Sequence, residues 1–228
     1  MTQYLPPPAC IVKVGEGRGF IVEYRVKFRH PKSRLKQTRK SGLRTTGHVK
    51  NRLVVTAAHC LPKLPPSHAG AYSSDRTYDL LGSLDGTKNG VWAECLFVNP
   101  VADIAVLGCP DDQELGDQAD LYNQLADAAP SLRIGTARTG RGWVLSLDGK
   151  WIRTSLEIFS GLGGVSLSID PTLPGMSGSP VLNDAGRAVA VAVIGCETES
   201  KSGKLQNERA GPQPILSLEL PGWLLRGN

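Results

Sequence analysis

Short runs of β-branched and other apolar residues recur along the chain and are separated by turns rich in glycine and proline. The 228 residues include 26 Gly and 16 Pro, which interrupt the chain too often for long helices. This pattern predicts an all-β fold, and closing the strands into barrels would remove their exposed edges. The runs expected to form strands cover residues 19–26, 52–56, 103–107, 143–147, 165–169 and 188–194.

One stretch in the middle of the chain departs from the β pattern. Residues 111–130 begin with an acidic run and continue with apolar residues at helical spacing. We expect a short helix or an acidic linker there, between a first β unit at 10–110 and a second at 131–228. Residues 1–9 form an N-terminal tail in this division, and the apolar residues 220–225 are expected to pack a short terminal turn onto the second unit.

Three residues lie in local contexts typical of nucleophilic catalysis. His59 follows Thr-Ala-Ala, Asp103 precedes Ile-Ala-Val-Leu, and Ser177 lies within Gly-Met-Ser-Gly-Ser-Pro-Val. A serine hydroxyl is a poor nucleophile at neutral pH unless a base removes its proton and a third group orients that base. Asp103 follows His59 by 44 positions and Ser177 follows Asp103 by 74, so only a tertiary fold can bring the three together.

The glycines on both sides of Ser177 belong to the same prediction. Two backbone N–H groups must point at one developing oxyanion, and glycine permits the tight turn with positive φ that this requires. We assign the predicted oxyanion hole to the N–H groups of Gly175 and Ser177.

These motifs resemble those of the chymotrypsin-like (trypsin-like) serine peptidases, over roughly residues 10–222. The resemblance implies that His59 is the general base, Asp103 orients its imidazole and Ser177 is the nucleophile. It also implies a fold of two packed antiparallel six-stranded barrels with the active site in the cleft between them. The Ser-Gly-Ser-Pro-Val ending is most similar to the compact bacterial branch that includes the glutamyl endopeptidases.

The resemblance also implies which residues line the primary specificity pocket: Thr172 on one wall, and Ala192, Val193, Ile194 and Gly195 on the other. Glutamyl endopeptidases carry a histidine in the second segment to hold the substrate carboxylate, and Ala192 occupies the aligned position here. We therefore expect a small or apolar P1 residue instead of glutamate, with a basic P1 residue as the alternative.

Met176 stands where many secreted relatives carry an aspartate that pairs with a newly cut amino terminus. A thioether cannot accept that ion pair, so we expect no activation by N-terminal processing. Residues 1–9 lack the order of a signal peptide. The five cysteines are an odd number, and Cys60 lacks the upstream partner that secreted relatives provide. We therefore expect free thiols in a cytoplasmic protein, and no metal or cofactor, because the cysteine spacings are not those of zinc sites.

The net charge of +5 comes from one segment. No acidic residue lies between Tyr24 and Ser74, whereas lysines and arginines crowd residues 25–52. This segment is interpreted either as a docking site for an acidic partner or as a solvated hairpin. Base stacking on nucleic acid is poorly supported because few aromatic residues are interleaved. No run approaches the roughly 18 apolar residues of a membrane span.

The resulting hypothesis is a serine endopeptidase that cleaves a protein substrate through an acyl-enzyme on Ser177. Narrow substrate choice, as in a regulatory or defence role, is expected of a cytoplasmic peptidase without a zymogen switch. Two alternatives remain. One is an inactive peptidase fold that recruits an acidic partner through residues 25–52, and the other is an esterase.

Overall fold

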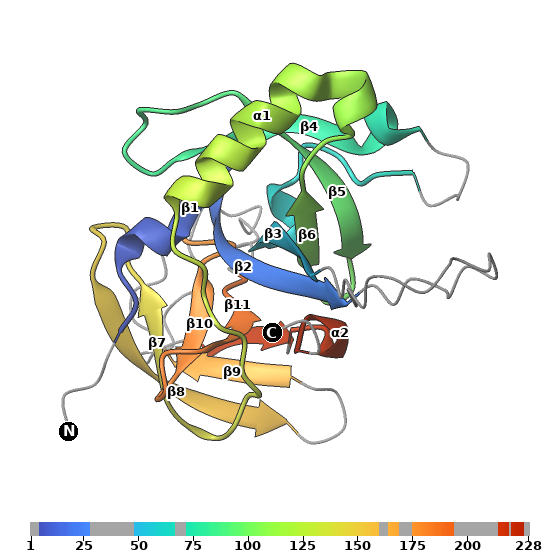
Figure 1. Ribbon diagram of the computed structural model, residues 1–228. Helices are drawn as coiled ribbons and strands as arrows, with labels where there is room; N and C mark the ends of the chain where they lie inside the picture. The colour runs from blue at the N-terminus through green and yellow to red at the C-terminus, as the bar shows by residue number, and fades with distance from the viewer. Residues whose placement is uncertain are drawn as a thin grey trace, which may run out of the picture.

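The computed structural model describes residues 5–27, 48–66, 72–159, 164–168, 175–193, 214–218 and 220–225. Two β units lie one above the other in Figure 1, a closed barrel and a second six-stranded sheet. This arrangement confirms the predicted all-β class. The barrel contains β1 (Ile11–Val14), β2 (Gly17–Lys27), β3 (His48–Thr56), β4 (Thr77–Ser83), β5 (Val91–Asn99) and β6 (Ile104–Gly108). The sheet contains β7 (Gly140–Leu145), β8 (Trp151–Phe159), β9 (Gly164–Ser168), β10 (Pro180–Asn183), β11 (Ala188–Val191) and β12 (Pro214–Leu218). The helical elements are η1 (Pro8–Cys10), η2 (Ala58–Cys60), η3 (Ser73–Arg76), α1 (Asp112–Ala128) and α2 (Gly222–Leu225).

The first unit is a barrel because its outer strands pair with each other. The strand order is β1-β2-β3-β6-β5-β4, and antiparallel pairing of β1 with β4 closes the ring. Apolar side chains such as Phe20, Val54 and Leu107 are completely buried in its core. Burying each such side chain is worth roughly 1.5–3 kcal/mol, so the core is the main stabilising contribution to this unit.

The second unit has the six strands that the resemblance implies, in the order β11-β10-β7-β8-β9-β12. Its two outer strands, β11 and β12, come into contact. Just beyond β12, the backbone N–H of Leu220 donates to the carbonyl of Val189 in β11 at 3.1 Å. This bond joins the two ends of the sheet. Among the described strands, β11 and β12 form no β ladder with each other. The expected second barrel is therefore observed as a sheet whose outer strands meet.

The chain crosses between the two units directly after α1. Leu132 forms a parallel bridge with Val22 of β2, and its N–H donates to the carbonyl of Ile21 at 2.7 Å. Two residues later, Ile134 forms a parallel bridge with Ala188 of β11. This short connection fixes the second sheet against the barrel.

Helix α1 occupies most of the range for which the sequence left a helix or a linker open. The Asp111 carboxylate caps its N-terminus by accepting the N–H of Gln113 at 3.0 Å. The helix packs on β3 and β5 across the barrel, at the top of Figure 1. Its buried Tyr122 donates a hydrogen bond to the Arg52 carbonyl at 2.8 Å.

Arg52, the last residue of the basic segment 25–52, has a structural role at the other end of this helix. Its Nη1 donates to the carbonyls of Ala126 and Ala129, both at 2.6 Å, and its Nε lies 3.3 Å from Asp127. A cation at a helix C-terminus stabilises it by about 0.3–1 kcal/mol. The other basic side chains of residues 25–52 lie outside the description, so the proposed docking of an acidic partner remains a prediction.

The terminal helix α2 corrects one expectation. Trp223 packs edge-on against Tyr24 and Phe97, with ring centroids 5.9 and 5.6 Å apart. Both partners belong to the first barrel, in β2 and β5. The terminal turn therefore packs its tryptophan onto the first barrel, and not only onto the second unit as expected. The aromatic partners come from distant strands, so the local sequence around residue 223 cannot reveal them.

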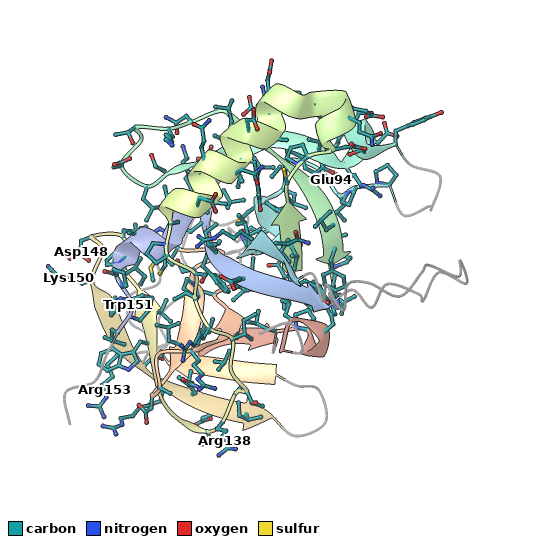
Figure 2. The ribbon with its side chains drawn as sticks, viewed as in Figure 1. Glu94, Arg138, Asp148, Lys150, Trp151 and Arg153 are labelled. Carbon is teal, nitrogen blue, oxygen red and sulfur yellow. The ribbon has the colours of Figure 1, made fainter. Side chains whose placement is uncertain are left out.

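The segment before β1 is attached to the second unit. Trp151, labelled in Figure 2 at the start of β8, donates its Nε1–H to the carbonyl of Pro6 at 2.8 Å. Pro6 is buried, and Cys10 in η1 is completely buried. Residues 5–10 are thus bonded to the second unit directly before the chain enters β1 of the barrel.

Candidate active site

The pairing of β3 with β6 brings two predicted site residues together. Thr56, the last residue of β3, lies opposite Ala105 in β6, so the turn after one strand meets the turn before the other. The Nδ1 atom of His59 lies 2.6 Å from Asp103 Oδ2, and the His59 backbone N–H donates to Asp103 Oδ1 at 2.9 Å. Both carboxylate oxygens therefore orient one histidine, and its Nε2 remains as the nitrogen available to take a proton.

The backbone of Asp103 is held in an uncommon conformation. Its φ of 50° lies in the left-handed region, where aspartate is among the few residues besides glycine that are found routinely. The Asp103 carbonyl accepts the N–H of Ala58 at 3.1 Å. This bond and the two carboxylate contacts hold the residue against the His59 turn, a type of local strain that clusters at functional sites.

The electrostatic surroundings of His59 favour its protonated form. The hydrogen bond to Asp103 raises the pKa of His59 above its ordinary value of 6.5, and it outweighs the opposing effect of partial burial. The His59 side chain is 45% exposed and that of Asp103 is 23% exposed, so solvent screens the pair partly. A raised pKa suits a general base, because the imidazolium that forms when His59 accepts a proton is then stabilised.

We predict that kcat/KM for a small ester rises with pH through a midpoint above 6.5, because only neutral His59 can accept the serine proton. The contribution of the same pair to the free energy of unfolding changes with pH in the opposite direction. It is present below the unfolded-state pKa and is lost as pH rises through the higher folded-state pKa. A pH–rate profile and thermal unfolding over the same range test both trends, and a flat rate profile from pH 5 to 8 would contradict the assignment.

The Ser177 turn is anchored on the first barrel beside the His59 turn. The Ser177 carbonyl accepts the N–H of Arg18 at 2.7 Å, and the Cys60 Sγ lies 3.9 Å from the same oxygen. Since Cys60 directly follows His59, the turns that carry the predicted base and nucleophile are in contact. The structure thus brings the segments of all three sequence-predicted catalytic residues into one region: His59 in η2 after β3, Asp103 directly before β6, and Ser177 in the turn before β10.

The two glycines of this turn are required by its geometry. Gly175 and Gly178 have φ values of 90° and 83°, in the region that favours glycine. A Cβ atom on Gly178 would lie 1.8 Å from the carbonyl oxygen of Arg18. No L-amino acid with a side chain can occupy that position unless the turn moves away from the barrel.

We predict that Gly178→Ala lowers the free energy of unfolding by about 3–5 kcal/mol, since strain and overpacking add at this position. Gly149→Ala is the matched control, because Gly149 has a similar φ of 80° but nothing within 4 Å of its Cβ position. Urea unfolding of both variants measures the difference. Equal losses in the two variants would show that the contact with Arg18 has no energetic weight.

The two predicted oxyanion donors differ from their neighbours in the turn by having no hydrogen-bond acceptor among the described residues. The N–H of Gly178 donates to the Ala192 carbonyl at 2.8 Å, and the N–H of Ser179 donates to the Met176 carbonyl at 3.0 Å. In the part of the chain that is described, no acceptor takes the N–H of Gly175 or Ser177. These two amides are available to a developing oxyanion.

The residues between and after these glycines are buried. Met176 packs in the second core with Val144, Val181 and Val189, so its side chain is part of the apolar packing and not of an ion pair. Ser179 is completely buried, and its hydroxyl has no hydrogen-bond partner among the described residues. Ser179 is thus closed to solvent, whereas Ser177 keeps 8% of its surface exposed.

The structure describes part of the expected specificity pocket. Ala192 lies beside the nucleophile turn, because its N–H and carbonyl are bonded to Ser179 and Gly178, respectively, at 2.8 Å. Its methyl group is buried in the second core, whereas Val193 is partly exposed. Thr172, Ile194 and Gly195 lie outside the described residues, so the pocket assignment and the P1 preference remain predictions.

The start of β2 lies against the Ser177 turn, and sequence reasoning did not assign it to the site. A Cβ atom on Gly17 would lie 2.6 Å from both the Ser177 carbonyl and the Cys60 Sγ. The next residue, Arg18, bonds the Ser177 carbonyl and accepts a hydrogen bond from the Thr56 hydroxyl at 2.6 Å. The glycine spacing Gly-Arg-Gly was the only local signal of this close approach.

The described cysteines are all free thiols: Cys10, Cys60, Cys95 and Cys109. Burial raises the pKa of Cys60, and it raises the pKa of Cys10 to about 12 and that of Cys95 to about 11. These three buried thiols are therefore poor nucleophiles at neutral pH. Cys196 lies outside the described residues.

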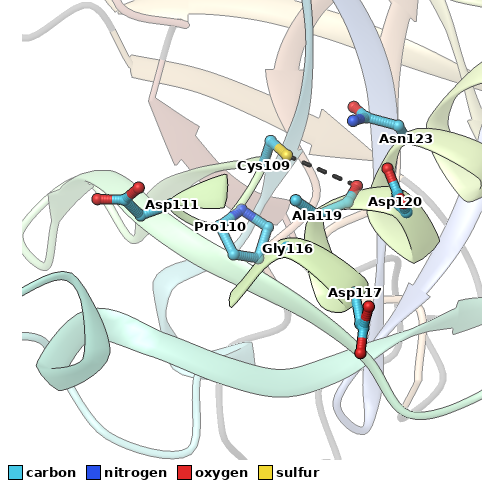
Figure 3. Close-up of a pocket in the computed structure, with 8 residues that line it drawn as sticks. All are labelled: Cys109, Pro110, Asp111, Gly116, Asp117, Ala119, Asp120 and Asn123. Carbon is cyan, nitrogen blue, oxygen red and sulfur yellow. Dashed lines mark hydrogen bonds between the residues drawn. The ribbon is translucent and has the colours of Figure 1, made fainter. Parts of the chain in front are cut away.

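A separate hollow is formed by the end of β6 and the start of α1. Figure 3 shows that its lining includes Cys109, Asp111, Asp117 and Asp120, and none of the predicted catalytic residues. The described residues contain no cluster of three side chains placed to hold a metal ion. None of their helices is long and apolar enough to cross a membrane.

Solved structures of several serine proteases are similar to this chain. The serine protease of a human pathogenic astrovirus matches with a TM-score of 0.51 and 14% identity over 96% of this chain and 93% of that chain, which supports the fold. The serine endoprotease from Yersinia pestis matches with a TM-score of 0.47 and 12% identity over 96% of this chain and 64% of that one. A third match is the HtrA-type protease AlgW, with a TM-score of 0.43 and 17% identity over 96% and 63% of the two chains. Among curated proteins, no sequence relative was found.

The barrel and sheet, with the paired His59 and Asp103 beside the Ser177 turn, have the fold of the chymotrypsin-like serine peptidases. The family model of the trypsin-like peptidase domain matches residues 44–191, which is more than half of the chain. The protein therefore belongs to the family of trypsin-like peptidase domains. The narrower resemblance to the glutamyl endopeptidase branch stays a prediction.

Proposed function

We propose that the protein is a serine endopeptidase that hydrolyses peptide bonds of a protein substrate through an acyl-enzyme on Ser177. The observation that carries the proposal is the double contact of the Asp103 carboxylate with His59, beside a turn that presents Ser177 between two glycines of positive φ. The membership in a peptidase family supports the same reaction class.

The proposed reaction uses each group once in each half. Ser177 Oγ attacks the scissile carbonyl carbon while His59 Nε2 takes its proton, and the N–H groups of Gly175 and Ser177 bind the oxyanion. The C–N bond then breaks, and the imidazolium returns the proton to the leaving amine. Water repeats the sequence on the acyl-enzyme and restores the serine. Asp103 stabilises the imidazolium in both halves without accepting its proton.

We also propose that the enzyme acts in a reducing compartment, in the cytoplasm, and without N-terminal processing. The free state of the described cysteines supports the first part. The burial of Met176 in the second core supports the second, because an activating amino terminus would find no carboxylate there. An uncontrolled peptidase would damage its own cell, so we propose narrow substrate choice in a regulatory or defence role.

Incubation of the intact protein with a peptide library derived from a proteome, read by mass spectrometry, tests the proposed reaction. The expected result is a small set of internal cleavage sites that share a P1 preference, and little degradation of casein. Hydrolysis of simple esters without any peptide cleavage would identify an esterase. Rapid digestion of casein would overturn the proposed narrow choice but not the reaction.

A further inference from the structure

A buried arginine joins the two β units at the predicted nucleophile. Arg18 lies near the start of β2 in the first barrel and is only 7% exposed. Its Nη1 donates to the carbonyls of Leu145 and Ser146, at 3.2 and 2.8 Å, and its Nη2 donates to the carbonyl of Leu147 at 3.3 Å. All three acceptors belong to the end of β7 and the turn after it, in the second unit.

The contacts that stabilise this buried cation come from backbone carbonyl oxygens. Among the described residues, no carboxylate forms an ion pair with Arg18. A buried charge without a counterion is strongly unfavourable unless its hydrogen-bonding capacity is satisfied. The three carbonyls accept bonds from three of its five N–H groups, and an uncharged side chain of similar length would leave these carbonyls without this donor. The position therefore requires a long donor with several N–H groups.

The backbone of Arg18 holds the predicted nucleophile from the other side. Its N–H donates to the Ser177 carbonyl at 2.7 Å, and its own carbonyl accepts the Thr56 hydroxyl at 2.6 Å. Thr56 is the last residue of β3, three positions before His59. One residue thus touches both the strand that leads to the base and the turn that carries the nucleophile.

The turn that the guanidinium binds lies near the predicted oxyanion glycine. Leu147, whose carbonyl Arg18 binds, would lie 3.5 Å by its Cδ2 from a Cβ atom placed on Gly175. Leu147 is 44% exposed. In that turn, Asp148 pairs with Lys150 at 2.8 Å, and Figure 2 shows the two at the edge of the molecule.

From these contacts we infer that Arg18 is a positioning residue, which fixes the turn from Gly175 to Ser177 relative to the first barrel and so aligns the oxyanion donors with His59. This role rests on the proposed function of that site. Among the described residues, the Arg18 side chain donates only to the carbonyls of Leu145, Ser146 and Leu147. Its loss should lower the rate of acylation and leave the KM for a small ester nearly unchanged.

Three variants separate positioning from simple stabilisation. Arg18→Met removes the guanidinium at similar length, and Arg18→Lys keeps the charge but loses the planar fork. Arg52→Met is the matched control, because Arg52 is also a partly buried arginine that donates to backbone carbonyls, at the end of α1 and outside the site. Acylation by an activated ester, urea unfolding and amide hydrogen exchange are measured on all three full-length proteins.

We expect Arg18→Met to acylate about 10²-fold more slowly than the wild type, which is the effect of a misplacement near 1 Å. Amide exchange should become faster in residues 145–149 and 175–179, and Arg18→Lys should recover part of both losses. Arg52→Met should lose stability and keep its acylation rate. If Arg18→Met does not fold, Arg18→Lys is compared with Arg52→Met instead. Arg18→Lys should then acylate more slowly than Arg52→Met for the same loss in the free energy of unfolding.

Wild-type rates and exchange in the Arg18 variants would overturn the positioning role while leaving the proposed function intact. The positioning role is also overturned if Arg52→Met slows acylation as much as the Arg18 variants do. A wild-type protein that does not acylate would instead overturn the proposed function. In that case, faster exchange at 145–149 and 175–179 in Arg18→Met still supports Arg18 as the link between the two units, and unchanged exchange refutes it.

Discussion

His59→Ala is expected to lower the rate of acylation by about 10⁶-fold, the effect typical of removing the base from a serine triad. The physical reason is that a serine hydroxyl needs a base, and His59 is the predicted base that both oxygens of Asp103 orient. Single-turnover hydrolysis of an activated ester, with active sites counted beforehand, measures the loss directly.

Thermal unfolding of the same variant is the control for this first prediction. The His59 side chain is nearly half exposed, so its removal should change the unfolding temperature little. A folded variant that retains more than about 1% of the acylation rate would be incompatible with His59 as the sole base, given the expected 10⁶-fold effect.

Asp103→Asn is expected to lower the turnover number by about 10⁴-fold while the protein remains folded. Asparagine tolerates the left-handed conformation that Asp103 adopts, so the backbone can stay in place. An amide has one oxygen and one NH₂ group, and an NH₂ that faces Nδ1 forces the imidazole proton onto Nε2. The base is then present in the wrong tautomer.

Comparison with Asp103→Ala sharpens this second prediction. Alanine loses both the orienting oxygens and the tolerance for a φ of 50°, so Asp103→Ala should be less stable than Asp103→Asn as well as inactive. Steady-state turnover and urea unfolding distinguish the two effects. Near-wild-type turnover of Asp103→Asn would remove Asp103 from the triad.

The class of fold and the candidate triad were predictable because their signals are local. The strand runs are short, apolar and bounded by glycine and proline, and each strand end carries its functional residue with it. Asp103 directly precedes β6, and His59 follows β3 by three positions. Once β3 pairs with β6, their contact follows from the register of Thr56 with Ala105.

The features that were not predictable depend on contacts between distant parts of the chain. The guanidinium of Arg18 binds the Leu145 carbonyl across 127 positions, a separation over which local sequence patterns carry no signal. In the sequence, Arg52 is one more charge of the basic segment, yet it caps α1. Trp223 packs on the first barrel because Tyr24 and Phe97 meet there, which no periodicity near the C-terminus can reveal.

The most direct test of the account is fluorophosphonate labelling of the intact, full-length protein, with Ser177→Ala and Ser179→Ala beside the wild type. Both variants remove one hydroxyl from the same turn, but only Ser179 is completely buried with an unpartnered Oγ. If Ser177 is the nucleophile, wild type and Ser179→Ala are labelled, without any trimming, and Ser177→Ala is not. A folded wild type that takes no label, or a label that persists in Ser177→Ala, would contradict that assignment.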